Sequence, residues 1–249
     1  VARKGAHDAG LIRAMGADDL ALLCDAAARL PVLKVTLAPE TVTPDQVATL
    51  VAAGVIVSLG HSDAGFGTCM AAAKAGASCV THLFNAMSQL GNREPGLVGA
   101  ALTCGGLSAG LIADGIHVHP ASIRAAMAAK AGPGQVFLVS DAMSVAGSEQ
   151  TEFTLNGRLI RRVAGRLTLE DGTLAGADLD QLTAVRNLVG WGITDEPRAL
   201  AMATSIPADL IGVAGYGRLT PGGPADFLHL DGSGPPAVWQ AGALLPPAA

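Results

Sequence analysis

Two apolar runs in the first third of the chain each end at a histidine. Residues 55–59 (VIVSL) lead to His61, and residues 78–81 (SCVT) lead to His82. The alanine-rich segment between them, up to Gly76, has the composition of a helix. Two strands joined by a helix form a parallel βαβ unit, so both histidines are predicted to project from the carboxyl edge of one sheet.

Two imidazoles at that edge can hold one metal ion. The alternative is that they mark two unrelated polar strand ends, with Ser62 or Asp63 capping the following helix. The spacing alone leaves both interpretations open.

The same alternation continues on both sides of this unit. Further apolar runs predict strands at residues 32–37, 107–113 and 135–140. Helical patterns alternate with them at residues 18–30, with Asp18 as the expected cap, and at 44–54 and 120–131. Five strands alternating with helices indicate an α/β fold with a parallel sheet or a (β/α) barrel.

The pattern changes after residue 150. Residues 152–173 contain strand-like runs with turns at Asn156-Gly157 and Asp171-Gly172, which predict a β insertion. Helical patterns return at residues 177–190 and 196–203. From residue 217 the chain is rich in glycine and proline, and short apolar runs at 226–230 and 237–240 suit a small β unit. We therefore expect a catalytic domain over residues 1–214 and a second domain over 215–249.

Composition narrows the possible functions. Half of the residues are hydrophobic but only 3% are aromatic, so alanine, valine and leucine must fill the core. The formal net charge of −5 gives no basic footprint for nucleic acid or for a membrane surface. The four cysteines show no CxxC pairing and are expected to be small buried side chains, as is usual in an intracellular protein. The chain begins at Val1 rather than at a methionine, and we expect it to be a fragment.

Further polar residues follow the predicted strands. Asp141, directly after residues 135–140, is the best candidate for a general base beside a metal-bound water, although it can also serve as a turn cap. His117 is expected to point to the site and His119 to lie on the surface. Arg93, in a polar glycine-rich loop, is either an anion ligand or a solvated arginine. Glu40 is either a metal ligand or a helix cap.

These residues lie in segments that resemble a known family. The segments are KGAH at 4–7, LAPE at 37–40, GHSDA at 60–64, THLFNAM at 81–87, REPGLVGA at 93–100, IADGIHV at 112–118, SDA at 140–142 and GTLAGA at 172–177. In this order, and over nearly the whole chain, they resemble the N-acetylglucosamine-6-phosphate deacetylases of the amidohydrolase superfamily.

The resemblance implies a metal-dependent (β/α)8 TIM barrel, present here from about strand 4 to strand 8, with part of a small β-sandwich. It implies a divalent metal ion, most often Zn²⁺ with Fe²⁺, Co²⁺ or Mn²⁺ as alternatives, bound by His61 and His82. Asp141 matches the catalytic acid/base. The positions that match substrate-binding residues are Ala6, His7, Asn85, Ala86, Arg93, His117, Leu174, Ala175 and Gly176.

The resemblance also implies a cytoplasmic homodimer, or a dimer of dimers, in which Arg93 reaches the phosphate in the neighbouring subunit's site. The expected substrate is therefore a small sugar phosphate, not nucleic acid or a membrane. The expected reaction is hydrolysis of the acetamide of N-acetylglucosamine 6-phosphate. The alternatives are another amidohydrolase or deaminase, which has no use for Arg93, and a non-catalytic sugar-phosphate-binding protein.

The chain departs from the family pattern in several respects: the early barrel strands and the N-terminal half of the β-sandwich are absent, the loop at residues 142–147 falls where the family varies, and one metal ligand is missing. The family's glutamate metal ligand lies in an HLEGP-type motif that would precede Val1 and is absent from this sequence. A catalytic zinc site usually has about three protein ligands. We therefore expect residues 1–249 to be inactive alone.

Overall fold

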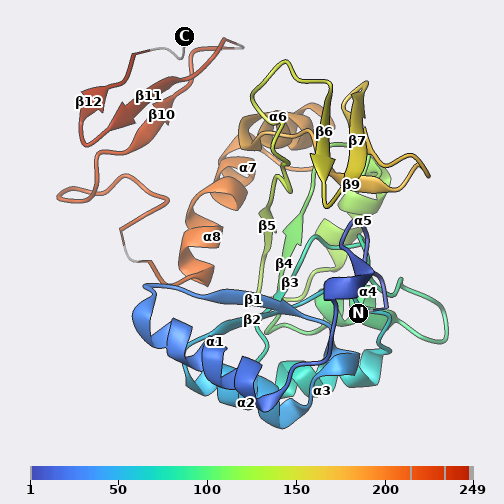
Figure 1. Ribbon diagram of the computed structural model, residues 1–249. Coiled ribbons are helices and arrows are strands. Elements are labelled where there is room, and N and C mark those ends of the chain that lie inside the picture. The colour runs from blue at the N-terminus through green and yellow to red at the C-terminus, as the bar shows by residue number, and fades with distance from the viewer. Residues whose placement is uncertain (1, 214, 233, 247–249) are drawn as a thin grey trace.

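A five-stranded parallel sheet forms the centre of the molecule (Figure 1). The computed structural model describes residues 2–213, 215–232 and 234–246. The strands are β1 (Lys34–Leu37), β2 (Ile56–Leu59), β3 (Cys79–Val80), β4 (Ser108–Leu111) and β5 (Val136–Leu138). They pair in chain order and every pair is parallel. The predicted alternation and the α/β class are therefore confirmed, and the carboxyl ends of all five strands lie along one edge.

Helices connect and cover these strands. They are α1 (Ala17–Arg29), α2 (Pro44–Ala52), α3 (Phe66–Lys74), α4 (Gly96–Thr103), α5 (Pro120–Ala129), α6 (Gln181–Gly190), α7 (Glu196–Ala203) and α8 (Ser205–Leu210). Helices α1, α2 and α3 lie on one side of the β1–β2 part of the sheet, and α6, α7 and α8 lie near β5 (Figure 1). Helices α4 and α8 were not predicted. Within the described residues, every helix is too short or too polar to span a lipid bilayer.

Two predicted helix starts are corrected by local hydrogen bonds. Asp18 does not cap α1, because Gly16 is the N-cap and its N–H donates to Asp19 Oδ2 at 2.8 Å. Neither Ser62 nor Asp63 caps α3, because the free N–H of Phe66 donates to Glu94 Oε1 at 2.6 Å. The alternative prediction, that Ser62 or Asp63 caps the helix after His61, is therefore wrong.

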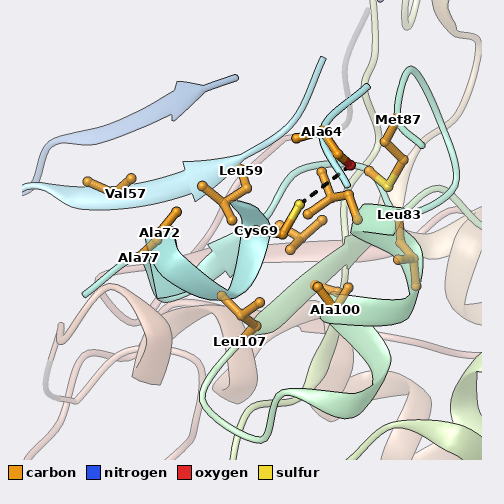
Figure 2. Close-up of a cluster of buried hydrophobic side chains, with 14 of the residues drawn as sticks. Val57, Leu59, Ala64, Cys69, Ala72, Ala77, Leu83, Met87, Ala100 and Leu107 are labelled. Atoms are coloured by element: carbon orange, nitrogen blue, oxygen red, sulfur yellow. Dashed lines mark hydrogen bonds between the residues drawn. The ribbon is translucent and has the colours of Figure 1, made fainter. Parts of the chain in front are cut away.

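Small side chains fill the core around β2 and β3, as the composition required. Figure 2 shows Leu59 beside Cys69 of α3 in a buried cluster that also contains Leu107, and all three residues have no exposed surface. The Cys69 thiol lies 3.8 Å from the carbonyl oxygen of Ala64. Burial raises the pKa of this thiol to about 11, so it stays protonated and behaves as a small apolar group. Cys79 is likewise buried, whereas Cys24 and Cys104 are half-buried.

A separate antiparallel sheet follows β5. Its strands are β6 (Glu152–Leu155), β7 (Arg158–Val163), β8 (Arg166–Thr168) and β9 (Leu174–Ala177), paired in chain order. The turns at Asn156-Gly157 and Asp171-Gly172 fall where the sequence predicted them, but the sheet extends to Ala177 rather than ending at residue 173. The next helix accordingly begins at Gln181 instead of Ala177, because Asp180 accepts a hydrogen bond from the N–H of Thr183 and caps it.

The C-terminal part of the chain forms a third, small sheet. It consists of β10 (Phe227–His229), β11 (Ala237–Gln240) and β12 (Ala243–Leu244), and all of its pairs are antiparallel. Phe227 and Trp239 stack across it with their ring centroids 5.6 Å apart. This sheet lies apart from the parallel sheet (Figure 1).

Candidate active site

A pocket of about 390 Å³ opens at the carboxyl edge of the parallel sheet. The ends of β2, β3, β4 and β5 contribute one wall, and the N-terminal loop and the β6–β9 sheet contribute the rest. Its lining residues are Arg3, Gly5, Ala6, His7, His61, His82, Asn85, Ala86, His117, Asp141, Met143, Leu155, Thr173, Leu174, Ala175 and Gly176. Every residue that the family resemblance assigns to the site lies in this pocket except Arg93.

The two strand-end histidines meet in the pocket. The Nε2 atoms of His61 and His82 are 3.0 Å apart, and their ring centroids are 4.8 Å apart. Two nitrogens that bind one zinc ion at about 2.0–2.1 Å in tetrahedral geometry lie roughly 3.3 Å apart. The spacing is therefore close to that of two ligands on one ion.

The surroundings of the two rings also suit ligation. His61 Nδ1 lies 2.9 Å from the carbonyl oxygen of Arg3, which can only accept, so Nδ1 carries the hydrogen and Nε2 of the neutral ring keeps its lone pair. Burial, and then the neighbouring His82, lower the pKa of His61. Burial likewise lowers the pKa of His82, whose Nδ1 is buried and has no hydrogen-bond partner among the described residues. Both imidazoles are therefore neutral at pH 7, the form that binds metal.

The His61–His82 pair does not form a complete metal site by itself, however. No group of three or more His, Cys, Asp or Glu side chains in the described residues has the geometry of a metal site. Glu40 is occupied elsewhere, because its carboxylate accepts a hydrogen bond from Ser62 Oγ at 2.5 Å and another from the N–H of Asp63 at 3.2 Å. Glu40 therefore supports the loop that carries His61. The two imidazole nitrogens of His61 and His82 thus fit part of a metal site.

The backbone at the chemistry-bearing residues is unusual. The backbone φ angles are 51° at His61, 29° at His82 and 51° at Asp141. These values fall in the left-handed region, which residues other than glycine seldom adopt. Such strained positions cluster at functional sites, where the surrounding structure enforces them. The three residues follow β2, β3 and β5 and lie at the edge of the sheet where the pocket opens.

Asp141 follows β5 and faces the histidine pair. Its side chain lines the pocket, and its charge acts on the rings of both His61 and His82. The N–H of Ala177, at the end of β9, donates to the carbonyl oxygen of Asp141 at 2.7 Å and ties the β6–β9 sheet to the site. Next to this bond, Gly176 has φ 70°, and a Cβ there would stand 2.5 Å from Met143 Cγ, so the close approach requires glycine.

The N-terminal loop and the β6–β9 sheet close the pocket opposite the strand ends. The His7 ring packs edge-on against His61, with centroids 4.8 Å apart. Arg158 of β7 donates a hydrogen bond to the carbonyl oxygen of Ala6. Leu174 and Ala175 of β9 complete this side. Residues far apart in sequence thus hold the loop that presents His7.

His117 enters the pocket from the loop after β4 and is held by Asp114. His117 Nδ1 lies 2.6 Å from Asp114 Oδ2, and both side chains are 7% exposed. Burial alone would raise the pKa of Asp114, but hydrogen bonds from the His117 ring and from the backbone N–H groups of His117 and Ile116 outweigh it, and the pKa of the carboxyl is lowered. Asp114 was not predicted from the sequence as part of the site, although its position three residues before His117 is a pattern that could have indicated the pairing.

Arg93 is the predicted site residue that lies elsewhere. It is exposed, and it does not line the pocket of its own chain. Glu94 beside it has a structural function as the acceptor at the start of α3. His119 is exposed, as expected, and caps α5 by accepting from the N–H of Ala121 at 3.1 Å. Five further residues that line the pocket were not named from the sequence, although two of them lie in the quoted segments KGAH and GTLAGA: Arg3, Gly5, Met143, Leu155 and Thr173.

The chain is similar in sequence to curated deacetylases. No protein-family model matches it. It is 44% identical over 251 residues to the N-acetylgalactosamine-6-phosphate deacetylase of Shewanella sp. (strain ANA-3), covering 98% of this chain and 62% of that relative. It is 36% identical over 211 residues to the N-acetylglucosamine-6-phosphate deacetylase of Vibrio furnissii, covering 84% of this chain and 52% of that relative.

Solved structures of deacetylases also have the same fold as this chain. The N-acetylglucosamine-6-phosphate deacetylase of Pasteurella multocida superimposes with a TM-score of 0.91 at 32% identity, over 98% of this chain and 64% of that one. A mutant deacetylase from Mycobacterium smegmatis, in complex with N-acetyl-D-glucosamine-6-phosphate, gives a TM-score of 0.87 at 33% identity, over 97% of this chain and 65% of that one. The chain thus spans less than two thirds of the length of these proteins.

Proposed function

Because the chain belongs to the family of the N-acetylated amino-sugar 6-phosphate deacetylases, we propose that the protein hydrolyses the acetamide of N-acetylglucosamine 6-phosphate. The products are glucosamine 6-phosphate and acetate. The observation that carries this proposal is the convergence of His61, His82, Asp141, His7 and His117 in one pocket. A cytoplasmic place in amino-sugar breakdown belongs to the same proposal.

The metal ion is part of the proposal, with His61 and His82 as two of its ligands. When bound, a divalent ion, most often Zn²⁺, would lower the pKa of a water molecule and polarise the amide carbonyl. The two neutral imidazoles, with Nε2 atoms 3.0 Å apart, support this assignment. A third protein donor, which the family resemblance expects to be a glutamate, is not found among the described residues.

The remaining residues bind, orient and move a proton. Asp141 accepts the proton of the attacking water at its carboxylate and returns it to the departing amine nitrogen. His7 and His117 hold the sugar from opposite sides of the pocket and orient the acetamide. The backbone of residues 174–176 borders the sugar. Arg93 of a neighbouring subunit binds the phosphate through a charge-assisted, bidentate contact.

A second substrate is favoured by a specific observation. The Shewanella relative, which matches 98% of this chain, and an Escherichia coli relative, 37% identical over 97% of this chain, are both named N-acetylgalactosamine-6-phosphate deacetylases. The two sugars differ only in the configuration of one hydroxyl group. We therefore propose N-acetylgalactosamine 6-phosphate as the alternative substrate.

The test is acetate release by the protein at its natural length, supplied with Zn²⁺ and each of the two sugar phosphates. We expect acetate and free amine in equal amounts, and the ratio of the two kcat/KM values identifies the sugar. In parallel, residues 1–249 alone are expected to bind zinc weakly and to release no acetate.

Other results would identify the rival functions. Binding of the sugar phosphates without acetate release would indicate a non-catalytic binding protein. Turnover of cyclic amides or amino-heterocycles, with no preference for a phosphorylated sugar, would indicate another amidohydrolase or a deaminase.

A further inference from the structure

Asp114 and His117 form a buried pair beside the pocket. His117 lines the pocket, whereas Asp114 does not. Both side chains are 7% exposed. Asp114 therefore does not reach a bound substrate, and any effect it has on the reaction passes through His117.

The Asp114 carboxylate is the acceptor for three donors. Oδ1 accepts from the backbone N–H groups of Ile116 and His117, each at 2.8 Å, and this closes the turn after β4. Oδ2 faces His117 Nδ1 at 2.6 Å. These contacts fix the turn and the ring together, so the plane of the imidazole is set by the carboxylate.

The same contacts determine where the ring proton lies. An ionised carboxylate can only accept hydrogen bonds, so His117 Nδ1 must carry the hydrogen. In a neutral imidazole the other nitrogen is then an acceptor. When the ring is neutral, His117 Nε2 thus has a lone pair available for a hydroxyl hydrogen of the pocket's occupant.

We propose that Asp114 is a positioning residue that holds His117 with its proton on Nδ1, so that Nε2 accepts a hydrogen bond from a sugar hydroxyl. This proposal rests on the proposed function, because it takes the pocket's occupant to be a sugar. The lowered pKa of Asp114 keeps the carboxylate ionised at neutral pH, as the arrangement requires. Nothing in the reaction itself consumes or alters Asp114.

The test replaces the carboxylate with an amide of nearly the same shape, in the variant Asp114→Asn. The amide oxygen can still accept from Ile116 and His117 N–H, while the amide NH₂ donates to Nδ1 and shifts the ring hydrogen to Nε2. In ¹⁵N NMR spectra of the ring nitrogens, we expect Nδ1–H in the wild type and Nε2–H in the variant. We expect kcat/KM to fall about 10–100-fold, the range seen when orienting partners are removed, mostly through KM.

Two controls separate positioning from a merely structural function. Asp180→Asn alters a carboxylate that caps α6 outside the pocket, and should leave both the His117 spectrum and the kinetics unchanged. In a His117→Gln background, Asp114→Asn should change kcat/KM less than about twofold, because the two residues act as one unit.

Failure of the Asp114 proposal can be distinguished from failure of the proposed function. A wild-type ring with its hydrogen on Nε2 would overturn the inference without any variant. An undiminished effect of Asp114→Asn in the His117→Gln background would overturn it too. If the wild type releases no acetate from either sugar phosphate, the proposed function fails, while the ring spectra of wild type and variant still decide the place of the proton.

Discussion

At the scale of single residues, the site combines groups of different exposure. His82 is buried and His61 is half-buried, which keeps both rings neutral, whereas Asp141 is exposed at the mouth of the pocket. A carboxylate that meets solvent can exchange protons with water, and neutral rings can serve as ligands. The proposed division of tasks, with the histidine pair as metal ligands and Asp141 as the base, agrees with this difference.

The variant Asp141→Asn should keep the fold and the bound metal but lose most turnover. The amide is nearly isosteric with the carboxylate, yet it cannot accept the proton of the attacking water. We expect kcat to fall on the order of 10²–10⁴-fold. The measurement is steady-state acetate release together with metal content, and a variant with full metal content and normal kcat would assign the base to another group.

At the scale of elements, the strands and their order could be predicted from sequence, but several helix boundaries could not. Apolar runs followed by polar residues locate β2 to β5 well, because parallel strands buried on both faces need such runs. In β1, exposed residues alternate with half-buried ones. Helix α4 was missed because its residues are buried all round and lack a polar face. The start of α3 depends on Glu94, which is distant in sequence, and no local pattern reveals it.

The variant Glu94→Gln should therefore lower the melting temperature. The Glu94 carboxylate accepts from Phe66 N–H at 2.6 Å and Gly96 N–H at 2.9 Å, and these bonds lower its pKa below the ordinary value of 4.5. A lowered folded-state pKa contributes stability above the unfolded pKa, and this stability is lost as pH falls through the folded value. The difference in Tm between wild type and variant should thus be largest at pH 6–7 and shrink below about pH 4.5.

The matched control is Glu170→Gln, which alters an exposed carboxylate in the β8–β9 turn. Its effect on Tm should be small at every pH. A difference between wild type and Glu94→Gln that grew on acidification would contradict the capping function.

At the scale of the whole molecule, the site residues named from the sequence could be located because their motifs were matched as a set. Spacing alone left the metal interpretation and the capping interpretation open. Only the fold places residues 6, 7, 61, 82, 85, 86, 117, 141 and 174–176 around one pocket. Arg93 shows the limit of one chain. It is exposed and does not line the pocket of its own chain, and its proposed function requires a second copy.

The variant Arg93→Ala should raise KM for the phosphorylated sugar far more than for the unphosphorylated one. Loss of a charge-assisted bidentate contact corresponds to roughly 1.5–3 kcal/mol. Mixing Arg93→Ala with Asp141→Asn subunits should restore activity to about a quarter of wild type, because half of randomly paired dimers then contain one complete site. Equal effects on both sugars, or no recovery on mixing, would place the phosphate elsewhere.

The left-handed backbone at His61, His82 and Asp141 lowers the folding free energy that the protein could otherwise reach. The chain retains side chains at three positions where glycine would relax the backbone, so part of its folding free energy is given up to keep its chemistry. In metal-free protein, His61→Gly should accordingly be more stable than His61→Ala by about 1 kcal/mol, the reverse of the usual order of these two residues. Chemical denaturation of the two variants measures this difference, and the usual order would show that residue 61 carries no strain.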